Sequence, residues 1–277
     1  MTLGRLVAPW AILVGFAGLI GQLQGCFTRT MSQSQVDRLT QPDPNSVRQR
    51  AIRRVTLASA YFEQDQLNAA MQEARAALQI DPDFAQAYSL LGLIHQRNNA
   101  VELAQQSFET ALLMSAKTSM GGDELAAIQH NYGWFLCQQG KYVNAMDQFD
   151  RAISQPSYRQ PGKTWLVMGI CQVRAKQFVQ ARISLTNALR LSPQDATVKT
   201  ELAALEWREG NPEPSRQVLG NLNSTPQATA ASLWLGILLA REAKQLFETE
   251  TLGERLVQLF PASPQAAWWL QRKFDDK

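Results

Sequence analysis

The chain has 277 residues, with 27 Lys and Arg against 24 Asp and Glu, a formal net charge of +3, 45% hydrophobic residues and three Cys. This composition excludes a largely disordered chain and a disulfide scaffold. The balanced charge gives no electrostatic reason to expect a nucleic-acid partner. Because His95 and His130 are the only histidines, catalytic or metal sites based on histidine are disfavoured.

An apolar run near the N-terminus has the pattern of a secretion signal. Arg5 precedes an uncharged run over residues 6–20, and small residues then lead to Cys26. A transmembrane helix is the alternative, but it needs about 20 apolar residues, and this run is shorter and contains Pro9. Residues 23–26, with the sequence LQGC, resemble the bacterial lipobox, in which the Cys sulfur is lipidated, although the Gln is polar where a small or branched residue is usual. We therefore expect a lipoprotein whose Cys26 carries fatty acyl chains such as palmitate.

Acylation would set the destination of the mature chain, because several acyl chains on one residue form a stable membrane anchor. Phe27 follows the cysteine, whereas bacterial lipoproteins resembling this one carry Asp there when they stay at the inner membrane. The resemblance therefore implies the periplasmic face of the outer membrane. After a signal peptide over residues 1–25, residues 26–50 are polar, and we expect this acylated N-terminus to be a tether or a weakly helical lead-in.

The rest of the chain repeats one pattern with a period near 34 residues, which is the period of the tetratricopeptide repeat (TPR). Small residues recur at fixed offsets, where two antiparallel helices cross and a larger side chain would hold them apart. The signature positions hold Tyr88, Leu91, Gly92, Ala104, Phe108 and Ala111 in the second segment, and Trp165, Met168, Gly169, Ala181, Leu185, Ala188 and Pro193 in the fourth. The segments begin near residues 51, 85, 126, 162, 196 and 229.

These features predict an all-α TPR superhelical solenoid of about six helix-turn-helix repeats over residues 51–264. A C-terminal capping helix and tail follow at 265–277, where Trp268 and Trp269 would seal the apolar end of the stack. Residues 116–123 account for seven extra residues between the second and third repeats. They predict a surface loop, or alternatively a contact loop beside the groove. Gly and Pro over residues 210–214 predict a widened turn in the fifth repeat.

The first helices of TPR repeats line a concave groove where that family usually holds peptides. We expect the protein-binding groove to include Arg97, His130, Trp134, Leu166, Ile170, Arg174, Trp207, Arg208, Ile237 and Arg241. The four Arg residues share the thirteenth place of their repeats. There, a cation is favoured by about 0.3–1 kcal/mol through the helix macrodipole. Alternatively, they form a ladder for carboxylates or backbone carbonyls of an extended partner.

Neither the remaining cysteines nor His130 point to chemistry. Cys137 and Cys171 lie on first helices of neighbouring repeats; buried free thiols are the favoured interpretation, and a disulfide is open only if their Cα atoms approach within about 7 Å. His130 has no Cys, His or Asp neighbours at metal-ligand spacing. The sequence has no phosphate-binding Gly-rich loop, GxSxG or HExxH motif. We expect no metal, no cofactor, no small-molecule substrate and no enzymatic activity.

Together, the lipobox, the polar lead-in and six repeats resemble the PilF/PilW family of type IV pilus biogenesis/stability lipoproteins. Residues 130–137 (HNYGWFLC), residues 235–241 (LGILLAR) and residues 259–263 (LFPAS) are similar to segments of that family. The resemblance implies a pilotin-like protein that binds secretin subunits and assists their localisation and multimerisation in the outer membrane. The alternatives are a general periplasmic TPR lipoprotein scaffold and a co-chaperone for envelope or secretion machinery.

Overall fold

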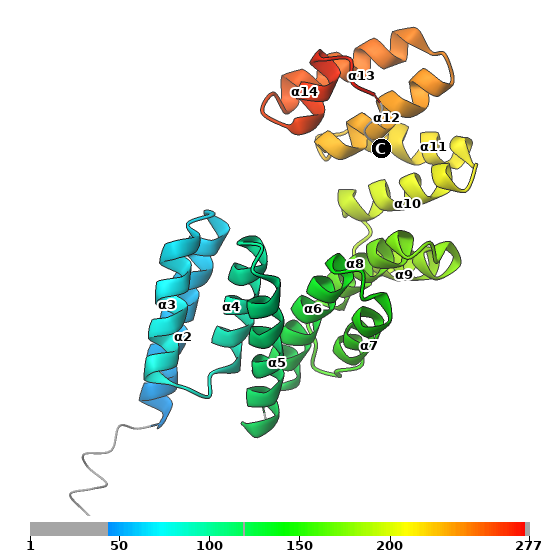
Figure 1. Cartoon of the computed structure of the whole chain (residues 1–277). Coiled ribbons are helices and arrows are strands. Elements are labelled where there is room, and N and C mark those ends of the chain that lie inside the picture. The colour runs from blue at the N-terminus through cyan, green and yellow to red at the C-terminus, as the bar shows by residue number, and fades with distance from the viewer. Residues whose placement is uncertain (1–43, 119, 275–277) are drawn as a thin grey trace, which may run out of the picture. The chain divides into compact units, whose positions relative to one another are not determined.

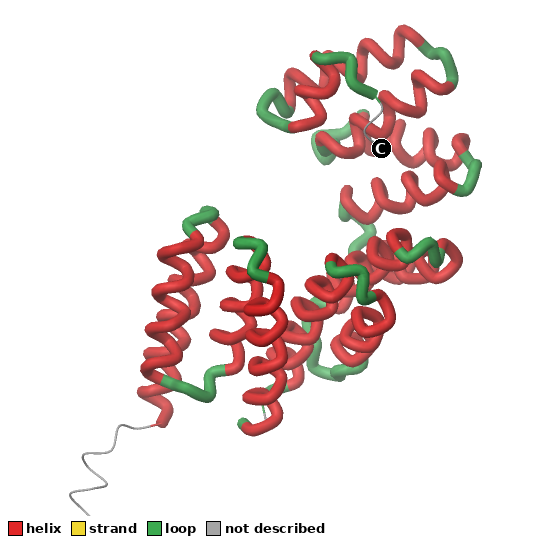
Figure 2. The backbone as a smooth tube through the Cα atoms, viewed as in Figure 1, coloured by secondary structure: helices red, strands yellow, loops and turns green. Residues whose placement is uncertain are grey.

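The computed structural model describes residues 44–118 and 120–274, and every regular element in this part of the chain is a helix (Figures 1 and 2). The signal peptide, Cys26 and most of the expected tether therefore lie outside the described residues. The helices are α2 (Pro44–Glu63), α3 (Leu67–Ile80), α4 (Ala85–Arg97), α5 (Val101–Lys117), α6 (Gly122–Gln138), α7 (Tyr142–Ile153), α8 (Pro161–Arg174), α9 (Phe178–Leu191), α10 (Ala196–Arg208), α11 (Pro212–Asn223), α12 (Ala230–Glu242), α13 (Leu246–Leu259) and α14 (Pro264–Leu270).

Twelve of these helices form six consecutive pairs, from α2 with α3 to α12 with α13, and α14 packs on both helices of the last pair. The first helix of each pair also contacts the first helix of the next pair, from α2 with α4 to α10 with α12. This arrangement confirms the predicted all-α fold of six helix-turn-helix repeats with a C-terminal capping helix. Within residues 44–118 and 120–274, no helix is both long and apolar enough to cross a membrane.

In the pairs α4–α5, α6–α7 and α8–α9 the two helices touch closely at a glycine, as the signature positions predict. A Cβ atom added to Gly133 of α6 would lie 2.7 Å from the Phe149 ring of α7, and one added to Gly92 of α4 would lie 2.8 Å from the Phe108 ring of α5. Both rings are fully buried. Glycine is required at these positions because any side chain would push the second helix away.

All six pairs are joined by a turn of the same construction. Three residues separate the two helices, and the middle one has a positive φ, which reverses the chain at the helix C-terminus. Glycine fills this place only twice; the six residues are Asp65, Asn99, Gly140, Lys176, Gly210 and Lys244. The fifth turn is therefore not widened as predicted, because Pro212 begins α11, a place where its missing N–H costs no hydrogen bond.

Three other boundaries differ from the sequence prediction. The extra residues at 116–123 mostly lengthen helices, since α5 continues to Lys117 and α6 begins at Gly122. At the N-terminal end, α2 begins at Pro44, so residues 44–50 of the expected lead-in are helical. The capping helix ends at Leu270, and its Trp269 packs so tightly on Gly253 of α13 that an added Cβ would lie 2.1 Å from the indole.

Candidate functional site: pockets along the first helices

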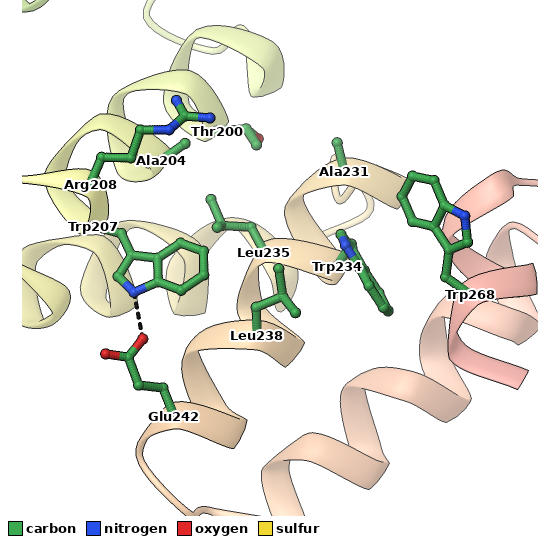
Figure 3. Close-up of a pocket in the computed structure, with 10 residues that line it drawn as sticks. All are labelled: Thr200, Ala204, Trp207, Arg208, Ala231, Trp234, Leu235, Leu238, Glu242 and Trp268. Atoms are coloured by element: carbon green, nitrogen blue, oxygen red, sulfur yellow. Dashed lines mark hydrogen bonds between the residues drawn. The ribbon is translucent and has the colours of Figure 1, made fainter. Parts of the chain in front are cut away.

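A pocket of about 650 Å³ lies between α10 and α12 and is closed on one side by α14 (Figure 3). We call it the tryptophan pocket, because an indole ring from each of these three helices lines it. Alanine, leucine and threonine side chains complete its walls, and one cation and one anion lie at its rim. Its residues are Thr200, Ala204, Trp207, Arg208, Ala231, Trp234, Leu235, Leu238, Glu242 and Trp268.

The three indole rings are held in different ways. Trp207 donates a hydrogen bond from Nε1 to Oε2 of Glu242 at 2.6 Å, which joins α10 to α12. Trp234 is 6% exposed and packs against Trp268, with 5.6 Å between ring centroids, and stacks on Phe274 at 5.8 Å. Within the part of the chain that the structure describes, the buried Nε1 of Trp234 has no hydrogen-bond acceptor. The fold therefore leaves this indole donor unpaired, with its nitrogen covered by protein.

The charges beside the pocket are unevenly engaged. Glu242 already accepts the Trp207 hydrogen bond, whereas exposed Arg208 takes part in no hydrogen bond or ion pair among the described residues. Glu201 lies within electrostatic range of Arg208 and Arg174. Burial raises the pKa of Glu201, and the two guanidinium groups oppose that shift. Arg208 is thus the cation at this pocket whose donors remain available.

A second pocket, of about 400 Å³, lies on the same series of first helices, at α2, α4 and α6. Arg97 is one of its lining residues, and the guanidinium lies 5.1 Å from the Phe62 ring centroid and donates to Oδ1 of Asp65 at 2.8 Å. Trp134 lines the opposite side. This pocket differs from the tryptophan pocket because its arginine is already paired.

The arginine column is found where the sequence places it, in the last turn of α4, α8, α10 and α12. Three of the four guanidinium groups lie over aromatic rings: Arg97 over Phe62, Arg174 over Trp134 at 5.0 Å, and Arg241 over Phe274 at 3.4 Å. These contacts fix the side chains through cation–π attraction. Arg208 is the member that lines the tryptophan pocket instead.

His130 occupies a small polar pocket of about 250 Å³ on α6 and α8, lined also by Asp123 and Lys163. Its Nδ1 lies 2.8 Å from Oγ1 of Thr164, which is also hydrogen-bonded to Tyr158. Burial, with a smaller effect of Lys163, lowers the pKa of His130 from 6.5 to about 4. His130 is therefore a neutral, hydrogen-bonded side chain at neutral pH.

Two predicted groove residues face the interior. Ile237 is fully buried in the core with Leu256 and Trp269, so its assignment to the groove is wrong. Leu166 is partly buried against the Leu185 and Leu205 cluster. Ile170 is half-buried and lines none of the pockets described above.

The sequence prediction missed the face of α12 that lines the tryptophan pocket, which includes Ala231, Trp234, Leu238 and Glu242. Residues 233–240 are almost uniformly apolar, because this helix is covered on several sides, and a helix without a polar face gives no periodic signal for its orientation. The four-residue spacing from Trp234 through Leu238 to Glu242 was the available signal.

The two cysteines of the repeats are bonded. Cys137 of α6 and Cys171 of α8 form a disulfide with their Cα atoms 5.8 Å apart, and both are buried in one core cluster. The expectation of free thiols is therefore wrong, and the alternative is found. The bond joins the first helices of the third and fourth repeats across their interface.

Within residues 44–118 and 120–274, no three His, Cys, Asp or Glu side chains are grouped so that they could hold a metal ion. The pockets combine indole, alkyl, amide and guanidinium groups, which bind by shape, hydrogen bonding and charge. Such surfaces are suited to holding a polypeptide segment.

Comparisons with known proteins agree with this architecture. Two family models, described as TPR repeat and Tetratricopeptide repeat, match residues 58–99 and 85–118. The type IV pilus assembly protein PilF of Pseudomonas aeruginosa is 27% identical over 209 residues, covering 76% of this chain and 80% of that protein.

Solved structures give the same result. The crystal structure of PilW, a type IV pilus biogenesis factor, superposes with a TM-score of 0.68 at 27% identity, covering 79% of this chain and 98% of that one. A structure of P. aeruginosa PilF gives a TM-score of 0.65 at 25% identity, covering 82% and 99%. The similarity thus extends over nearly all of the solved chains.

Proposed function

Because this chain is a TPR-repeat protein homologous to the type IV pilus biogenesis proteins PilF and PilW, we propose that it is a non-enzymatic outer-membrane lipoprotein that binds secretin subunits. In this role it assists their localisation and multimerisation into the pore through which the pilus emerges. The observation that carries the proposal is the similarity to PilF over 76% of this chain, which includes most of its repeats.

The pockets on the first helices support a scaffold function. TPR repeats act in protein–protein interaction, and grooves lined by helices bind extended or helical segments without covalent chemistry. The tryptophan pocket offers large aromatic surfaces with a polar rim, the composition typical of a protein-binding hot spot. In the proposed role, this surface holds a segment of the secretin subunit while the subunit is brought to its membrane.

The proposal is tested by deleting the gene and examining secretin multimers by gel electrophoresis of separated inner and outer membranes. We expect fewer heat-stable multimers in the outer membrane, more monomer elsewhere, and loss of pili. Re-expression of the wild-type chain should restore all three. Normal outer-membrane multimers with normal piliation in the deletion strain would refute the proposal.

The lipid anchor is part of the same proposal and has its own test. We expect a Cys26→Ala variant to keep the circular dichroism spectrum of the wild-type chain but to leave the membrane fraction, because the acyl chains supply the anchor. A Phe27→Asp variant is the matched probe of destination and should move to the inner membrane. Retention of the Cys26→Ala variant in membranes after a high-salt wash would contradict lipidation at this residue.

A further inference from the structure

The tryptophan pocket has the size and lining of a ligand site. Its volume of about 650 Å³ lies within the roughly 300–1,000 Å³ of typical ligand pockets. Figure 3 shows Trp207 and Arg208 on the α10 side, Trp234 and Leu238 on α12, and Trp268 beyond them on α14. A bulky apolar side chain that enters here would be enclosed by three indole rings and two leucines.

The donors beside these apolar walls are unequally engaged, since those of Thr200 and Trp207 have acceptors. The Nε1 of Trp234 is buried and unpaired within the described residues, and leaving a buried N–H without an acceptor is unfavourable. On the opposite wall, the guanidinium N–H groups of Arg208 have no acceptor among the described residues, whereas the carboxylate of Glu242 accepts a hydrogen bond from Trp207. Arg208 is therefore the charged group at this pocket whose hydrogen-bonding groups are open to a partner.

A second cation lies farther along the same first-helix surface. Arg174 on α8 is held over the Trp134 ring, and both Arg174 and Arg208 interact electrostatically with Glu201 of α10. Two guanidinium groups thus face the Glu201 carboxylate, and the carboxylate of Glu242 at the pocket rim balances the second of them.

Resting on the proposed scaffold function, we propose that the tryptophan pocket binds an internal, extended segment of the protein partner in which an aromatic residue is followed directly by an acidic one. The aromatic side chain fills the space between Trp207, Trp234 and Trp268. The carboxylate pairs with Arg208 at the rim. Arg–carboxylate pairing gives this contact its preference for acidic segments.

The direct test uses an acetylated and amidated hexapeptide, Ser-Gly-Phe-Asp-Gly-Ser, titrated into the full chain in detergent micelles. With ¹⁵N-labelled tryptophan, each indole N–H gives its own resonance, and six of the seven Trp residues follow the expected signal peptide. Trp234→Phe and Trp268→Phe variants each remove one resonance and so assign it. We expect saturable shifts at Trp234 and Trp268, because both indoles line the pocket that the peptide's aromatic ring enters.

Matched peptides and variants separate the contacts. We expect the dissociation constant to rise at least tenfold when the peptide's Phe becomes Ser, and likewise when its Asp becomes Lys. Arg208→Glu should weaken binding of the original peptide at least tenfold. Arg190→Glu makes the same charge change at an exposed position of α9 and should leave binding within twofold. Absence of saturable shifts at Trp234, or equal affinity for the Asp and Lys peptides, would overturn the proposal.

The same variants separate this inference from the proposed function in cells. We expect the Arg208→Glu chain to restore fewer secretin multimers to the deletion strain than the Arg190→Glu chain at equal protein level. Full restoration by Arg208→Glu would overturn the pocket assignment while leaving the scaffold function intact. If the deletion strain itself keeps its multimers, the scaffold function fails, and the peptide titration still decides what the pocket binds.

Discussion

Reduction of the Cys137–Cys171 disulfide should lower the free energy of unfolding by about 3–4 kcal/mol. The bond closes a loop with a sequence separation of 34 residues. In the chain-entropy description, such a loop restricts the unfolded chain by ~3.8 kcal/mol at 25 °C. The loop contains all the residues of α7. Breaking the bond therefore gives this whole segment more conformational freedom in the unfolded chain.

The measurement is urea unfolding followed by circular dichroism, with and without a phosphine reductant, in a Cys26→Ala background. For a denaturant slope near 2 kcal/mol/M, the reductant should move the midpoint of the transition that involves these repeats down by about 2 M. A Cys137→Ala/Cys171→Ala chain is the control and should unfold identically in both conditions. It should also be less stable than the oxidised chain, because both sulfur atoms are buried.

Two results would refute this reasoning. The first is an unfolding curve of the oxidised chain that the reductant does not move. The second is a thiol titration of the unfolded, unreduced Cys26→Ala chain that finds two free thiols, since all its remaining cysteines should be in the bond.

Three further changes should alter stability. Gly133→Ala should destabilise the fold by about 1–2 kcal/mol, because the added Cβ meets the Phe149 ring. Gly220→Ala is the control: its Cβ lies in open space, so the change should be neutral or stabilising by up to ~1 kcal/mol. Urea unfolding measures both effects. Because the pKa of His130 is lowered in the folded chain, the unfolded chain binds one more proton between pH 6.5 and 4. The free energy of unfolding should therefore fall by up to ~3 kcal/mol as pH falls through this window. His130→Gln should remove this pH dependence, and a variant whose unfolding depends on pH as the wild type does would contradict the reasoning. Asp195→Ala should cost about 1 kcal/mol in thermal unfolding, since its side chain caps α10 by accepting from two backbone N–H groups.

Sequence reasoning was most effective where one physical requirement recurs. Gly92 and Gly133 occupy the same place in successive repeats because each faces a buried ring of the second helix, so the period and the crossing points were readable. The prediction of a widened turn at residues 210–214 was wrong for a local reason. Gly210 takes the left-handed position that Lys176 and Lys244 take in other repeats, and Pro212 simply starts the next helix.

The parts of the site that could not be predicted depend on how helices are rotated and spaced. The apolar sequence of α12 does not distinguish its core side, which holds Ile237, from its pocket side, which holds Trp234 and Leu238. The disulfide was likewise hidden. Cys137 and Cys171 do not occupy equivalent positions in the predicted repeats, so only the spacing of the folded helices brings their Cα atoms to 5.8 Å.

The loop within each helix pair always has three residues. The connections that vary in length are therefore those between one pair and the next, at the opposite end of the pair. The connections between pairs, which are the longer loops in Figure 2, range from residues 81–84 to the longer segment 154–160. A tag, a fluorescent domain or a cleavage site is therefore best inserted in the exposed part of residues 154–160. There the added chain replaces no helix-reversing residue and leaves the three-residue turn of each repeat as it is.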